Sequence, residues 1–154
     1  MTLASGCIVA DPPQYRDPLQ TPPVLDLYLA NPSTQKVLVA RSHDTLHFLV
    51  PLRSEDAGDP LLVDFYQDSS INYNHIIPSS TFNDLGREVD VPWTAVGSPG
   101  CHVLTLTVVH VGNSSDPMRA RNDTAIATWW LNLDPDESMQ TTLSNCPTPA
   151  ALVP

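Results

Sequence analysis

Apolar and polar residues alternate along much of this chain. Between residues 104 and 108, leucine and valine occupy every second position and threonine fills the positions between them. Successive side chains of a β-strand point to opposite faces, so this pattern predicts a strand with one buried face. Seven or eight segments share this character: Val24–Leu29, Lys36–Arg41, Thr45–Leu52, Leu61–Gln67, Ile71–Ile77, Glu88–Trp93, His102–Val111 and Ala125–Leu133.

The stretches between these segments are rich in proline, glycine, aspartate and serine. We expect loops over 53–60, 78–87 and 112–123, and no segment has the apolar spacing of an amphipathic helix. Short strands separated by turns predict an all-β fold, an antiparallel β-sandwich of seven to eight strands with immunoglobulin-like or fibronectin-like topology. A small barrel such as a jelly roll is the alternative. The 16 prolines agree with both, because helix interiors exclude proline.

The last two predicted strands resemble strands F and G of immunoglobulin-like domains. A long strand that opens beside Cys101 corresponds to strand F, and Ala125–Leu133 corresponds to strand G. Antibody domains also carry a cysteine in strand B that pairs with strand F, but Thr45–Leu52 contains none. The sequence therefore favours a fibronectin-like or bacterial immunoglobulin-like variant.

Composition divides the chain into three parts. Residues 1–23 contain a proline-rich segment that we expect to be an extended, semi-rigid tether. Residues 24–134 contain all the predicted strands and form the sandwich domain. Residues 135–154 are polar and contain further prolines, so we expect a C-terminal tail.

The charge balance excludes two classes of partner. The chain carries 17 acidic residues against seven lysines and arginines, a formal net charge of −10. Phosphate backbones and anionic lipid surfaces both require clustered basic residues, so we expect no nucleic acid partner and no purely electrostatic attachment to lipid. No run of about 18 apolar residues is present, so the sequence predicts no transmembrane helix.

The sequence contains no recognisable catalytic or metal-binding motif. The five histidines form neither a His-Glu-x-x-His motif nor a close ligand cluster, and the Gly-x-Ser-x-Gly, phosphate-loop and dinucleotide-binding patterns are missing. The acidic stretches do not match the twelve-residue calcium loop. We therefore expect no catalytic residue, metal or cofactor, and a protein that is not an enzyme.

The N-terminal residues Leu-Ala-Ser-Gly-Cys at positions 3–7 resemble the lipobox of bacterial lipoproteins. The resemblance implies that Cys7 is lipidated and anchors the protein to the outer membrane or cell surface, with the periplasm as the alternative. A signal peptide needs a basic segment and about 7–15 apolar residues, so we expect the natural chain to start upstream of Met1. Further motifs are similar to uncharacterised lipoproteins of the myxobacterial kind: Asp-Pro-Pro at 11–13, Arg-Ser-Glu-Asp-Ala-Gly at 53–58, Pro-Gly-Cys-His at 99–102 and Thr-Trp-Trp-Leu-Asn at 128–132.

If Cys7 carries lipid, Cys101 and Cys146 remain as the natural disulfide pair. An exported protein encounters an oxidising compartment, and the bond would hold the tail against the start of the predicted strand F. A free buried Cys101 with Cys146 in a loose tail is the alternative.

The candidate binding residues lie in loops and on an outward strand face. In an immunoglobulin-like sandwich the loop containing Glu55 and Asp56 lies at the same end as the loop containing Arg119 and Arg121, so we expect ion pairing between the two loops.

The sequence also contains two adjacent tryptophans in the last predicted strand. Trp129 shares the parity of the buried leucines, so Trp130 points outward, beside Tyr28 or Tyr66. These features favour a non-enzymatic envelope module that binds or assembles with another envelope protein. The alternative is a carbohydrate-binding domain that uses outward-facing aromatic side chains such as Trp130.

Overall fold

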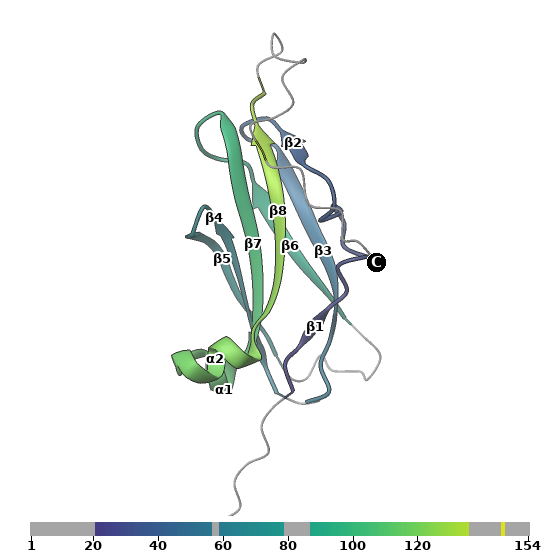
Figure 1. Ribbon diagram of the computed structural model, residues 1–154, viewed down its shortest axis with the longest axis vertical. Coiled ribbons are helices and arrows are strands. Elements are labelled where there is room, and N and C mark those ends of the chain that lie inside the picture. The colour runs from purple at the N-terminus through teal and green to yellow at the C-terminus, as the bar shows by residue number, and fades with distance from the viewer. Residues whose placement is uncertain (1–20, 57–58, 79–86, 136–145, 147–154) are drawn as a thin grey trace, which may run out of the picture.

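Two β-sheets pack face to face in a sandwich (Figure 1). The computed structural model describes residues 21–56, 59–78, 87–135 and 146. The smaller sheet has the order β1-β3-β6 and the larger sheet the order β2-β8-β7-β4-β5, which confirms the immunoglobulin-like sandwich. The strands are β1 (Val24–Leu25), β2 (Leu38–Ala40), β3 (Thr45–Arg53), β4 (Leu61–Gln67), β5 (Ser70–Ile77), β6 (Arg87–Thr94), β7 (Gly100–His110) and β8 (Ala125–Leu133).

The two N-terminal strands are shorter than the sequence predicts. The first ends at Leu25 because the chain then turns, and the backbone N–H of Leu29 donates to the carbonyl of Asp26 at 3.2 Å. β2 keeps only three residues, which pair in parallel with β8 at the edge of the larger sheet. Alternation alone predicts strands, but it does not show where the backbone leaves its partner.

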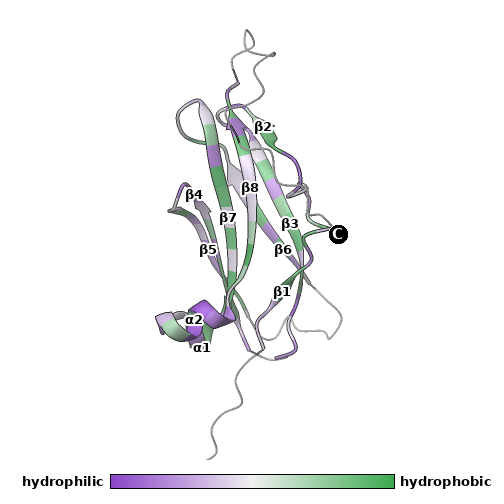
Figure 2. Ribbon diagram, viewed as in Figure 1, coloured by the Kyte–Doolittle hydropathy of each residue, from purple (hydrophilic) through white to green (hydrophobic). Residues whose placement is uncertain are grey.

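Alternation in the remaining strands builds the core (Figure 2). In β8 the buried positions are every second residue from Ala127 to Leu133, and in β4 every second residue from Leu61 to Gln67. Four aromatic rings fill the centre between the sheets. Phe48 lies 4.9 Å from both Phe65 and Trp129 between ring centroids, and Trp93 lies 6.2 Å from Phe48.

The expected loop over 112–123 is wrong, because two short helices occupy it. These are α1 (Val111–Ser114) and α2 (Pro117–Asp123). The Asp116 side chain accepts hydrogen bonds from the backbone N–H groups of Met118 and Arg119, and Pro117 takes the first helical position. An aspartate followed by proline is a helix-start signal that a search for apolar periodicity does not detect. Neither described helix is long or apolar enough to cross a membrane.

Replacing Phe48 tests the aromatic centre. Its side chain is fully buried between both sheets, so Phe48→Ala should lower the free energy of unfolding by about 3–5 kcal/mol. Urea denaturation measures the loss, with the exposed Thr128→Ala as the control. A loss below about 1 kcal/mol would contradict this packing.

Candidate functional site

The outer face of the five-stranded sheet carries several exposed apolar side chains. We use "outer face" for the outward-pointing residues of β2, β4, β5, β7 and β8. Among its large hydrophobic residues, Val39, Ile71, Ile76 and Ile126 are at least half exposed. Four further apolar members are half-buried: Leu62, Tyr66, Val103 and Trp130.

A polar group lies at the centre of the outer face. Asp64 accepts a hydrogen bond from the Asn74 side chain at 2.6 Å and another from the Tyr66 hydroxyl at 3.3 Å. Burial and the neighbouring Asp64 carboxylate raise the pKa of Tyr66 above its ordinary value. The face thus offers aliphatic surface around a fixed hydrogen-bonding centre, an arrangement suited to recognition.

The structure places the two tryptophans of β8 as the sequence predicts. Trp129 is fully buried, and its indole N–H donates to the carbonyl of Pro32 at 2.8 Å. Trp130 lies on the outer face opposite Val103. Tyr66 shares that face, whereas Tyr28 follows β1 of the other sheet.

The candidate residues at the loop end make different contacts from those expected. Arg119 pairs with Asp116 of its own helix at 3.6 Å, and Arg121 is exposed in the last turn of α2. Glu55 is exposed, and Asp56 accepts from the backbone N–H of Thr21 at 2.7 Å.

The two loops do meet, but a histidine joins them. His110 Nε2 lies 3.2 Å from the Ser54 hydroxyl and 3.9 Å from the Asp56 carboxylate. Trp130 lies near the other end of the sandwich, where β8 pairs with the start of β7, so the structure does not unite these candidate residues into one surface.

Ser54, His110 and Asp123 are arranged in the order of a catalytic triad. The ring Nδ1 of His110 lies 2.8 Å from one Asp123 oxygen, while its Nε2 faces the Ser54 hydroxyl. The sequence did not reveal this group because its members are 13 and 56 residues apart with no local motif.

Burial gives this group a structural role. His110 is completely buried, and both of its ring nitrogens face groups of the protein itself, Asp123 at Nδ1 and Ser54 at Nε2. Asp123 is 3% exposed and also accepts from the His110 backbone N–H at 3.0 Å and from the Asn113 side chain at 2.9 Å. The group therefore ties the helices to β7 and to the loop after β3.

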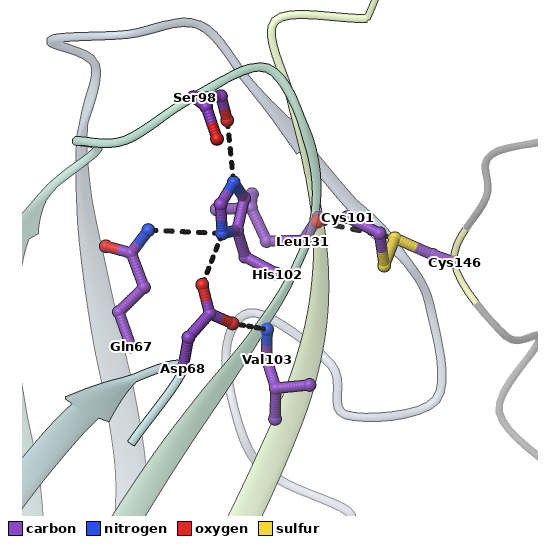
Figure 3. Close-up of a disulfide and its surroundings, with 8 residues drawn as sticks. All are labelled: Gln67, Asp68, Ser98, Cys101, His102, Val103, Leu131 and Cys146. Carbon is purple, nitrogen blue, oxygen red and sulfur yellow. Dashed lines mark hydrogen bonds and ion pairs between the residues drawn. A yellow bond between two sulfur atoms is a disulfide. The ribbon is translucent and has the colours of Figure 1, made fainter. Parts of the chain in front are cut away.

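The opposite end of the sandwich is held by a disulfide and a second histidine (Figure 3). Cys101 is bonded to Cys146, 45 residues away, which matches the pairing expected from the sequence. In the chain-entropy view such a loop contributes up to about 4 kcal/mol to stability. The Cys146 sulfur also lies 3.4 Å from the Leu131 carbonyl, so the bond holds Cys146 against β8.

His102 connects three segments beside the disulfide. Its Nδ1 lies 2.5 Å from the Asp68 carboxylate and its Nε2 lies 2.7 Å from the carbonyl of Ser98. Asp68 and Ser98 both present acceptor oxygens, which favours the charged, doubly donating ring. The Gln67 side-chain nitrogen lies 3.4 Å from the same Nδ1 but donates to the Val96 carbonyl at 2.7 Å. The hydrogen bond with Asp68, opposed by burial and assisted by Ser98, raises the pKa of His102 above 6.5. Burial works to raise the pKa of Asp68, but bonds from His102 and the Val103 N–H bring it below 3.8.

The fold and contacts define this chain as an immunoglobulin-like β-sandwich module. In the described part of the chain, no group of three or more His, Cys, Asp or Glu side chains is placed to hold a metal ion. Cys7, the expected lipidation site, lies outside the described residues.

Comparison with known proteins gives structural neighbours only. No family model matches this chain, and no curated protein matches it significantly. It is similar to the CARDB domain of a Pyrococcus furiosus protein, whose crystal structure is a complex with di-metal ions, at 14% identity and a TM-score of 0.43, over 63% of this chain and 80% of that one. The solution structure of the same domain gives 13% identity and a TM-score of 0.42, over 62% and 85%.

The His102 contacts make stability depend on pH. Because folding raises the pKa of His102, its contribution is fully present below the unfolded value of about 6.5 and is lost as the pH rises through the folded pKa. Urea denaturation between about pH 5 and 9 measures the free energy of unfolding of the wild type and of His102→Gln. The wild type should be the more stable protein at low pH, and this difference should shrink as the pH rises. An advantage that grows with pH would contradict the assignment.

If Ser54, His110 and Asp123 have a structural role, removing one of them should destabilise the protein, and Ser54 should not be a reactive nucleophile. Asp123→Ala removes the acceptor of several buried donors and should lower the free energy of unfolding by about 3 kcal/mol or more. The hydroxyl of Ser54 should not react with a fluorophosphonate probe, as read by intact-protein mass spectrometry. Covalent labelling that disappears in Ser54→Ala would show that the group is catalytic instead.

Proposed function

We propose that this chain is a non-enzymatic binding module of the bacterial cell envelope, lipid-anchored through Cys7, which recognises a partner protein with the outer face of its five-stranded sheet. The exposed aliphatic side chains of that face carry the proposal. Isolated exposed apolar residues are normal, but apolar side chains gathered on one face around a hydrogen-bonding centre are typical of interaction sites.

The rigidity of the sheet supports this role. The three central strands of the face, β4, β7 and β8, bury their opposite sides in the core, so their outward side chains are held in place before binding. A prearranged face loses little conformational freedom when a partner docks. His102 and His110 are both buried in contacts that hold parts of the fold together, and this supports a non-enzymatic role.

A carbohydrate ligand is the second candidate. Trp130 is flanked along β8 by Thr128 and Asn132, which share its face and could hydrogen-bond a sugar stacked on the indole. The remaining neighbours on the face are aliphatic, and this favours a protein partner. Glycan-array binding that disappears in Trp130→Ala would favour the carbohydrate alternative.

Site-specific photo-crosslinking in native cells tests the proposal. A benzoylphenylalanine at Ile126, which is 56% exposed on the outer face, should form a discrete adduct with an envelope protein. The same probe at Val24, which is 58% exposed on β1 of the three-stranded sheet, is the matched control and should form none. Equal adducts at both positions would contradict the outer face as the site.

The anchor is tested in the same cells. Mass spectrometry of the mature N-terminus should find acyl chains on Cys7 and no residues before it. An unmodified mature N-terminus at Met1 would contradict the lipid anchor while leaving the outer-face test intact.

A further inference from the structure

The edge strands of the two sheets differ in how they are protected. β1 and β2 have only two and three residues. β6 has eight, but Pro92 lies within it and Glu88 and Asp90 add charge. Short length, proline and charge all discourage an edge from pairing with another chain, since proline has no N–H to donate.

β5 is the one long described edge strand without such protection. It contains eight residues, none charged and none proline, and within the described sheet it pairs only with β4. A bulge lies near its start, where Tyr66 is opposite Ile71, and the stretch from Tyr73 to Ile77 is regular. Such an edge presents a row of backbone groups that an extended peptide can pair with.

A cleft of about 270 Å³ lies beside β5, between it and β6. Val63, Val89, Tyr73 and Ile77 give it apolar walls. Only two of its lining residues carry a formal charge at neutral pH, and both are carboxylates, Glu88 and Asp90. They alternate with the buried Val89 along β6 and are exposed, which places them at the rim of the cleft. The opening thus combines apolar walls with a negative rim.

We infer that β5 is a strand-addition site, and that its occupant is an extended segment of a basic partner protein with lysine or arginine at alternate positions. This inference rests on the proposed function and adds to it the conformation in which the partner binds, an extended segment. The added strand would lie about 4.8 Å from β5. Side chains on one side of it would extend the outer face next to Ile71 and Ile76, and those on the other side would enter the cleft.

Charge selects this occupant. A long basic side chain can lay its aliphatic stem along the apolar walls while its charged end reaches Glu88 or Asp90 at the rim. The net charge of −10 also attracts a cationic partner at a distance and repels an acidic one. A second copy of this chain would bring its own carboxylates to the rim, so self-pairing at β5 is disfavoured.

A peptide titration of the full chain tests the inference. The probe is an N-acetylated peptide of about ten residues in which valine alternates with lysine. It should slow amide hydrogen exchange along β5 and leave β6 unchanged, as read by NMR. A peptide with glutamate for lysine, and one N-methylated at alternate residues, should not.

Variants at the rim separate charge from packing. Glu88→Gln combined with Asp90→Asn should weaken peptide binding about fivefold, because each exposed pair contributes little. Asp44→Asn, in the turn before β3 at the opposite end of the sandwich, is the matched control and should change nothing.

Three results would overturn the inference. The first is slow hydrogen exchange of the β5 amides in the free protein. The second is equal binding of the N-methylated and unmethylated peptides. The third is a dimer that forms through β5 without peptide. Retained crosslinking at Ile126 in any of these cases would leave the proposed function standing, so the two can fail separately.

Discussion

The packing of four aromatic rings between the two sheets is the interaction on which the rest of this structure depends. Phe48 and Trp93 come from the smaller sheet, and Phe65 and Trp129 come from the larger one. Because β-strand side chains alternate, burying these rings also fixes which residues face outward. The outer face is thus a consequence of the core, since Trp130 and Tyr66 point out because Trp129 and Phe65 point in.

The two ends of the sandwich are stabilised in different ways. At one end, the buried side chains of His110 and Asp123 hold two short helices against β7. At the other end, His102 and the disulfide hold the turns that flank β7. Our proposal of a partner therefore rests on the side of the five-stranded sheet and its edge, and not on either end.

Much of the fold could be predicted because the alternation of apolar residues is local. Apolar residues at every second position predict the long strands. The same spacing predicts that Trp129 is buried and that Trp130 points outward. The helices at 111–123 were missed because a capping aspartate, rather than an apolar stripe, starts α2. The histidine networks and the β5–β6 cleft join residues from distant strands, so no short motif marks them.

Solvent access to the three indole rings tests the inside and outside assignment most directly. Adding a soluble gadolinium chelate and recording NMR spectra of the rings should broaden the signals of Trp130 and leave those of Trp93 and Trp129 sharp. A one-residue slip in strand register would invert every face. Broadened Trp129 signals together with sharp Trp130 signals would therefore contradict the assignment of both the core and the outer face.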